Sequence, residues 1–181
     1  MAVTDRDAAP RYGKALFEVA QEQDQLQAVH EEVNELQAVL KQTPELLSAL
    51  TSKNLTAADK DQLLSILLQS RSDLVTQLVG IVQANGRLGG LAAVFDDFEA
   101  RYDVANGIVK AVVTTAVAMS DTQLQAIKQA IATKLNAQAV EVTPIIDQSI
   151  VGGVKVVADD VVIDGTVATR LAKLRATLLS N

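Results

Sequence analysis

Residues 147–178 read DQSIVGGVKVVADDVVIDGTVATRLAKLRATL, and the hydrophobic pattern changes twice within this one stretch. Two valine-rich runs flank Asp159-Asp160, a pattern that predicts a β-hairpin. Asp164-Gly165 ends the second run, and Thr166 can cap the helix that follows. The apolar positions of that helix lie about one turn apart, at Val167, Leu171, Leu174 and Leu178. The stretch therefore predicts two paired strands followed by a C-terminal helix.

A change of structural class lies further upstream, at Asn106-Gly107. The β-branched run from Ile108 to Val117 predicts a strand. Ser120 can cap a helix whose buried face holds Leu124, Ile127, Ile131 and Leu135. The alternating segment 140–143 predicts a half-buried strand that ends at Pro144, a residue typical of strand ends and sheet edges. Residues 106–181 are thus predicted to form a small α/β domain, with a three- or four-stranded sheet and two helices.

Residues 4–105 contain only helical patterns. Thr4 can cap a first helix, and a second has apolar residues in three-four spacing over two heptads, which is typical of a bundle helix. Thr43-Pro44 stops the second helix and starts a short one from Glu45 to Leu50. Thr56 and Asp59 resemble a capping box for a fourth helix that runs through Leu68.

The fifth helix, from about Asp73 to Asn85, carries apolar residues around most of its circumference. Such a helix lies centrally in a bundle or faces both a core and a partner. Asn85-Gly86 ends it with residues that tolerate a positive φ. A sixth helix follows, with apolar residues one turn apart from Leu91 to Tyr102. The prediction is an α+β protein, in which an all-α six-helix bundle at 1–105 precedes the α/β domain at 106–181.

Composition excludes several classes of function. The absence of Cys excludes thiolate nucleophiles and Cys-ligated zinc, and the single His, His30, is expected to be exposed on a polar helix flank. Residues 1–105 carry 9 Lys+Arg and 16 Asp+Glu (net −7), whereas 106–181 carry 7 and 6 (net +1). The acidic first part argues against nucleic-acid binding and suits a basic partner, although a soluble acidic surface explains the same charge. No apolar run approaches the ~18–20 residues of a membrane span, so no direct membrane insertion is expected.

No motif predicts a catalytic, cofactor-binding or metal site. Gly152-Gly153 lacks the Gly-Lys-Ser/Thr of a phosphate loop and lies inside a predicted strand, where glycine marks a bulge or a close backbone approach. The glycines around Arg87 are explained by a turn between two helices. Asp96-Asp97 and the other paired carboxylates have no His or Lys in a buried setting that indicates acid–base chemistry.

Three separated segments together resemble one family. They are Arg11-Tyr12-Gly13-Lys14-Ala15-Leu16 in the first helix, Asn85-Gly86-Arg87-Leu88 after the fifth, and the Asp147–Gly153 and Val162–Thr166 motifs near the end. Their order and spacing resemble the delta subunit of F-type ATP synthases, the family of the oligomycin-sensitivity-conferring protein. Gly13 departs from the alanine more common in that family, and Thr166 replaces a serine while keeping the hydroxyl cap.

The resemblance implies a non-catalytic stator subunit at the top of the catalytic head. It implies that the N-terminal domain, 1–105, holds N-terminal helices of the alpha subunits, and that the C-terminal domain, 106–181, meets the C-terminal end of the peripheral b stalk. It further implies that the assembled stator couples ATP synthesis to ion flow, as a bacterial peripheral protein on the cytoplasmic face of the cell membrane.

Binding a helix in a groove needs apolar surface that the bundle leaves uncovered. The first and fifth helices have apolar residues in excess, and these are the candidate partner-binding residues: Tyr12, Ala15, Leu16, Val19, Val75, Leu78, Val79 and Val82. The alternative for each of them is an ordinary core position.

Two other functions remain open from the residues alone. A generic peptide-binding helical adaptor, unrelated to ATP synthase, explains the helices but not the C-terminal motifs. A small enzyme built on the α/β part has no identifiable nucleophile, base or phosphate loop.

Overall fold

The structure is a computed structural model that describes residues 5–52, 55–158 and 161–179. The N-terminal region is helical, with α1 (Asp5–Glu22), α2 (Leu26–Gln42), α3 (Pro44–Thr51), α4 (Ala57–Leu67), α5 (Asp73–Ala84), the short 3-10 helix η1 (Leu88–Gly90) and α6 (Leu91–Asn106). After it come β1 (Ile108–Thr115), α7 (Asp121–Leu135), β2 (Ala139–Ile146), the 3-10 helix η2 (Gln148–Ile150), β3 (Val154–Ala158), β4 (Val161–Asp164) and α8 (Val167–Leu179). The predicted α+β class is confirmed.

Some predicted features fall outside this description. Thr4, the expected cap of the first helix, and Asp159-Asp160, the expected hairpin turn, lie outside the described residues. So do the side chains of Leu174 and Leu178 on the last helix.

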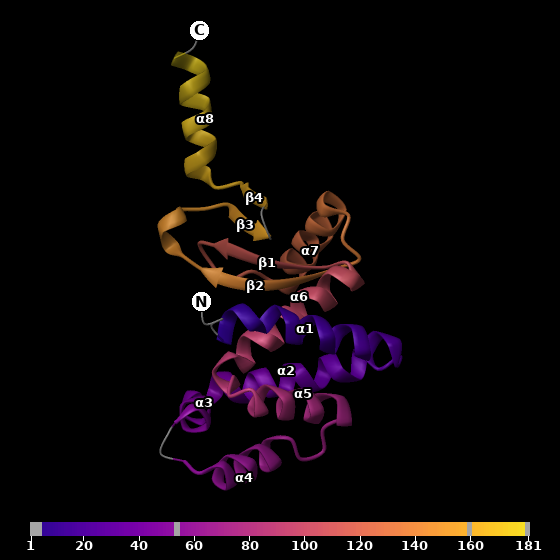
Figure 1. Ribbon diagram of the computed structural model, residues 1–181. Coiled ribbons are helices and arrows are strands. Elements are labelled where there is room, and N and C mark those ends of the chain that lie inside the picture. Colours follow the sequence, from indigo (N-terminus) through magenta and orange to yellow (C-terminus); the bar gives the residue numbers. More distant parts are fainter. Residues whose placement is uncertain (1–4, 53–54, 159–160, 180–181) are drawn as a thin grey trace. The chain divides into compact units, whose positions relative to one another are not determined.

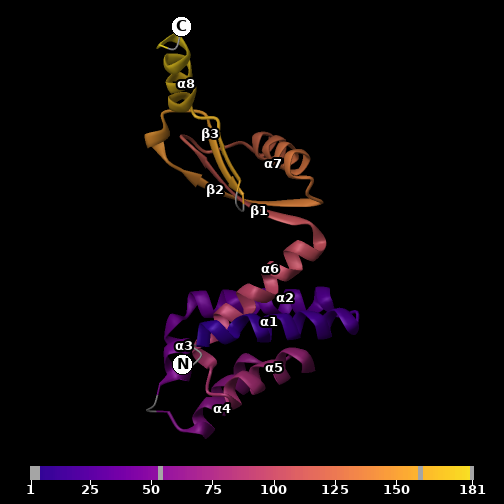
Figure 2. The same ribbon diagram turned by 45° about the horizontal axis from the view of Figure 1, so that its top comes forward.

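The chain divides into two compact units, Met1–Tyr102 and Asp103–Asn181, each with a core of its own. In the first unit, α1 packs against α2 and α5, and α2 also packs against α3 and α5. Figure 2 shows α1 and α2 running beside each other. Phe95 and Phe98 of α6 are the largest fully buried side chains. They are two of the three phenylalanines in a chain that is only 3% aromatic.

Local hydrogen bonds start two of the helices as predicted. The Asp59 backbone N–H donates to Thr56 Oγ1 at 3.2 Å, and the Thr56 N–H donates back to Asp59 Oδ2 at 3.1 Å. Ser120 and Gln123 make the same reciprocal pair before α7. Each box satisfies backbone donors that the first helical turn leaves without an intrahelical acceptor. The capping predictions at Thr56 and Ser120 are confirmed.

Gly13 marks a close approach between α1 and α6. A Cβ at Gly13 would lie 2.5 Å from Asp97 Oδ2 and 2.9 Å from the Val94 carbonyl oxygen. Asp97 is also held by Arg101, whose Nε donates to Oδ2 at 2.7 Å. The absence of a side chain at Gly13 therefore allows the two helices to touch, which offsets the cost of glycine within a helix.

Replacing Gly13 by alanine is expected to lower the free energy of unfolding by roughly 1–3 kcal/mol, because the Val94 backbone must shift. Gly80→Ala is the matched control, since Gly80 is exposed on α5 and a Cβ there meets nothing within 4 Å. We expect the control to raise stability by roughly 0.5–1 kcal/mol. Urea unfolding of both variants measures the difference. Equal stabilisation by the two substitutions would mean that α1 and α6 do not approach so closely.

The second unit is built on a four-stranded mixed sheet in the order β2-β1-β3-β4. Strand β1 pairs in parallel with β2 and antiparallel with β3, and β3 pairs antiparallel with β4. The sheet and the two helices α7 and α8 match the predicted inventory. The core lies on one face of the sheet and contains Ala111, Val113, Ile131, Val156 and Ala158.

Two strand boundaries differ from the prediction. Strand β1 ends at Thr115 rather than Val117, and β2 continues past Pro144 to Ile146. Pro144 is tolerated because β2 is an edge strand. Its open side has no neighbouring strand, so a residue without a backbone N–H is accommodated there. Within this unit, α8 projects away from the sheet beyond the end of β4 (Figure 1).

Candidate functional site

An apolar groove runs between α1 and α5 in the helical unit. Its volume is about 130 Å³, and it is lined by Ala15, Leu16, Val19, Leu74, Gln77, Leu78 and Ile81. Leu16 and Leu78 are buried, whereas Val19 is 37% and Ile81 52% exposed. The side chains at the groove thus remain partly wet in the free chain, and covering them would remove apolar surface from water.

Helical spacing places these residues on facing stripes. On α1, positions 15, 16 and 19 lie within about one turn, and on α5 Leu74, Leu78 and Ile81 are four and three residues apart. The contact between α1 and α5 brings the two stripes together. The only polar side chain of the lining is Gln77, so the groove offers an almost entirely apolar surface.

Four predicted partner-binding residues line this groove: Ala15, Leu16, Val19 and Leu78. Tyr12 is half-buried and packs against the core beside them. Leu74, Gln77 and Ile81 were absent from the predicted set. The four-three spacing of Leu74, Leu78 and Ile81 is the sequence signal that identifies this face of α5.

The predicted set of partner-binding residues needs a correction at three positions of α5: Val75, Val79 and Val82. They are 0%, 1% and 0% exposed and belong to the core of the helical unit. Val79 therefore occupies a core position, which was the alternative for each candidate. Helix α5 is apolar on most sides, and its neighbours α1, α2 and η1 determine which side is covered.

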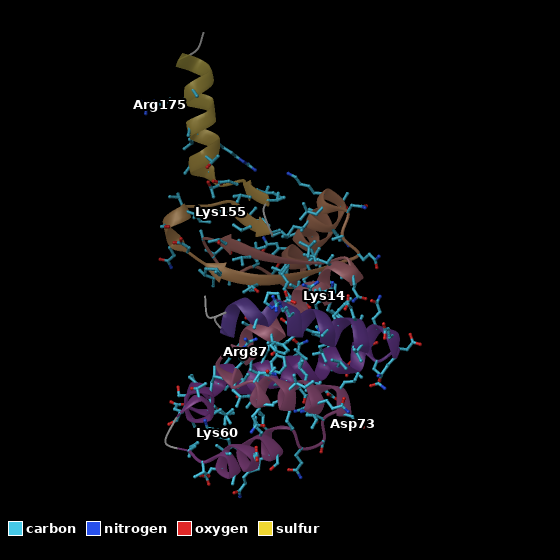
Figure 3. The ribbon with its side chains drawn as sticks, in the orientation of Figure 1. Lys14, Lys60, Asp73, Arg87, Lys155 and Arg175 are labelled. Carbon is cyan, nitrogen blue, oxygen red and sulfur yellow. The ribbon has the colours of Figure 1, made fainter. Side chains whose placement is uncertain are left out.

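Charges lie around the groove rather than within it. Lys14 and Glu18 on α1 form an exposed ion pair at 3.5 Å, which contributes little stability in water. Figure 3 shows Lys14 on α1 and Asp73 at the start of α5. The apolar lining of the groove is thus bordered by exposed charges of both signs on α1 and α5.

His30 differs from its predicted exposed setting. Its ring is half-buried and stacks on Tyr102, with centroids 3.7 Å apart and planes at 3°. Asn34 Nδ2 lies 2.9 Å from His30 Nε2. Among the described residues no group of three or more His, Cys, Asp or Glu side chains could hold a metal ion. No helix of the residues that the structure describes is both long and apolar enough to cross a bilayer.

Gly152-Gly153 precedes β3 instead of lying inside it, which corrects the predicted position. Gly153 has φ +88°, and a Cβ there would lie 2.5 Å from the Gly165 carbonyl oxygen. The prediction of a close backbone approach is confirmed. The Val167 N–H donates to the Gly152 carbonyl oxygen at 3.0 Å, so this loop holds the start of α8.

Hydrogen bonds around Thr166 complete the start of α8. Thr166 Oγ1 accepts from the Thr169 N–H at 3.3 Å, which confirms the predicted cap. The Thr166 N–H and the Thr169 hydroxyl donate to the Asp164 carboxylate, and these hydrogen bonds to its charged form lower the pKa of Asp164. A hydrogen bond from Ser149 lowers the pKa of Asp147 in the same way. Both carboxylates act as anchors for loops of the second unit.

Comparison with known proteins gives a consistent result. Residues 8–178 match the family described as ATP synthase delta (OSCP) subunit. The ATP synthase subunit delta of Lacticaseibacillus paracasei is 42% identical over 181 residues, covering 100% of both chains. That of Leuconostoc mesenteroides is 37% identical over 179 residues, covering 99% of each.

A solved structure is also similar. It is a chain in the cryo-EM structure of the Toxoplasma gondii mitochondrial ATP synthase hexamer, with a TM-score of 0.75 and 26% identity. The match covers 94% of this chain and 97% of that one.

Proposed function

The chain belongs to the ATP synthase delta (OSCP) subunit family, and from this we propose how its two units engage the enzyme. As a member, it is a non-catalytic stator subunit of a rotary ATP synthase. Peripheral association with the membrane, through the other subunits of the enzyme, fits this family. The cytoplasmic face of the bacterial membrane is the proposed location. Family membership excludes the two alternatives, an unrelated adaptor and a small enzyme.

The groove between α1 and α5 is the proposed site for an N-terminal helix of an alpha subunit. The supporting observation is the partly exposed apolar lining, above all Val19 and Ile81. An amphipathic helix can bury its apolar face there through anchors spaced one turn apart. The net −7 charge of residues 1–105 favours a helix whose outer face is basic.

Helices α1 to α6 are proposed to act as a single six-helix bundle in this interaction. The second unit is proposed to meet the C-terminal end of the b subunit, so that the predicted domains, 1–105 and 106–181, have different partners. Force then passes from the catalytic head through one unit to the other and into the stalk. A connector of this kind needs two binding surfaces and no reactive group.

Titration of a synthetic alpha-subunit N-terminal helix into the full chain tests the proposal. We expect one-to-one binding with a negative heat-capacity change, because apolar surface is buried. Methyl NMR signals of Val19, Leu74 and Ile81 should shift, while those of the second unit should not. A scrambled peptide of equal charge is the control. No binding, or shifts confined to other helices, would contradict the groove assignment.

A further inference from the structure

A second apolar groove lies in the C-terminal unit, where the segment after β1 meets the loop before β3. Its volume is about 520 Å³, and its lining includes Thr115 and Gln123 but no charged side chain. Small residues make up much of the lining: Ala116, Ala118, Ala126, Gly152 and Gly153. Small side chains allow another backbone to approach closely. Val117 and Val151 are 72% and 79% exposed, so most of the surface of these two apolar residues at the groove is in water.

The backbone at Val151 is strained. Its φ of +60° is a genuine outlier for a β-branched residue. Hydrogen bonds hold the loop on both sides: the Asp147 N–H donates to the Thr115 carbonyl oxygen at 2.8 Å, and the Val167 N–H donates to that of Gly152 at 3.0 Å. Strain of this kind persists where surrounding contacts impose it, and it clusters at binding sites.

Helix α8 continues the groove. A Cβ built on Gly152 would lie 3.4 Å from Val167 Cγ2, so the first apolar side chain of α8 lies against a residue of the groove. Val167 is 41% and Leu171 60% exposed, which extends the apolar surface along the first turns of the helix. The groove and α8 thus present one continuous apolar surface within the same unit.

The charge of α8 indicates the chemistry of an occupant. Residues 167–179 contain Arg170, Lys173 and Arg175 and no acidic residue, in a chain whose net charge is −6. No ion pair to Arg170 or Arg175 occurs among the described side chains. Figure 3 shows Arg175 on α8, away from the sheet. The apolar surface is therefore flanked by cations that a partner can neutralise.

We propose that this groove and the exposed side of α8 together dock one amphipathic helix that carries acidic side chains beside its apolar stripe. The apolar stripe enters between Val117 and Val151 and continues over Val167 and Leu171. The acidic side chains face Arg170 and Arg175. This inference rests on the proposed function, in which the second unit meets the end of the b subunit, and it assigns the surface and chemistry of that contact.

Binding of the C-terminal segment of the b subunit from the same ATP synthase to the full chain tests the inference. Val117→Glu and Val151→Glu should each weaken binding about tenfold or more, since each places a charge in an apolar contact. Val151→Gly separates strain from contact. Glycine accepts a positive φ, so this variant should melt at a higher temperature while binding the segment more weakly.

The double substitution Arg170→Glu with Arg175→Glu tests the charged flank. It should weaken binding of the segment and make the affinity less dependent on salt concentration. The reason is that the attraction between these arginines and the acidic side chains of the segment, which salt screens, is lost. Lys134→Glu, an exposed basic position on α7 outside the groove, is the matched control and should bind as the wild type does. Circular dichroism confirms that each variant is folded.

The outcomes distinguish the inference from the proposed function. If the wild type binds the segment and the Val117 and Val151 variants bind it with the same affinity, the groove is not the docking site. The proposed contact between the second unit and the b subunit would then still hold. Absence of any wild-type binding would overturn both. Self-association that the same substitutions abolish, measured by sedimentation, would make a second copy the occupant and overturn the acidic-helix assignment. Binding to anionic phosphatidylglycerol vesicles in place of the segment would overturn it as well.

Discussion

Val79→Glu is expected to unfold the helical unit rather than to damage a binding surface. Val79 is 1% exposed and lies in the core of that unit. A carboxylate at this position would be buried without a partner, at a cost of at least about 3–5 kcal/mol. That cost is comparable with the whole stability of a typical domain, about 5–15 kcal/mol. Thermal and urea unfolding followed by circular dichroism should show a lost or strongly lowered helical transition.

Thr76→Glu is the matched control for Val79→Glu. Thr76 is exposed on the same helix, so the new carboxylate remains in water. It also lies in the first turns of α5, where the helix dipole favours negative charge. We expect the control to unfold as the wild type does. If Val79→Glu kept its melting temperature and lost only alpha-peptide binding, Val79 would belong to the groove.

Ile81→Glu is expected to abolish most alpha-peptide binding while leaving the fold intact. Ile81 is 52% exposed in the free chain and lines the groove beside Val19 and Leu78. A partner helix would have to bury the new carboxylate against apolar side chains. Losing a hot-spot contact costs on the order of 2 kcal/mol, which corresponds to a roughly thirtyfold weaker affinity. Calorimetric titration measures the affinity, and the melting temperature should stay unchanged.

Ile66→Glu provides the matched control for Ile81→Glu. Ile66 is 63% exposed on α4 and lines a different hollow, formed with Val39 and Leu46. The two substitutions place the same charge on isoleucines of one unit that are both more than half exposed. Only Ile81→Glu should weaken binding of the peptide. If only Ile66→Glu weakened binding of the peptide, the alpha-subunit contact would lie at the hollow beside α4.

Features that depend on neighbours in sequence were predictable from the residues. The capping boxes at Thr56 and Ser120 need only a hydroxyl and a suitable side chain three residues later. The valine-rich runs before and after residues 159–160 pair as antiparallel strands β3 and β4, because β-branched residues favour strands. Thr166 caps α8 for the same local reason. Of these features, Thr166 and the run that precedes it also belong to the motifs that carry the resemblance to the delta family.

The candidate site was predictable only in part. Helices α1 and α5 do line the groove, and Leu16 and Val19 were expected there. Val79 is among the predicted groove residues but lies in the core. Ile81 is not among them but lines the groove. A helix that is apolar on most sides has no hydrophobic direction strong enough to orient it from its own sequence.

Local chemistry thus determined where the elements of this chain begin and which residue patterns they carry. Contacts between distant segments determined the rest: the rotation of α5, the approach of α1 to α6 at Gly13, and the stacking of His30 on Tyr102. The physical reason is the range of the interactions. A cap or a strand alternation is satisfied within a few residues, whereas burial depends on which surfaces meet after the chain has folded.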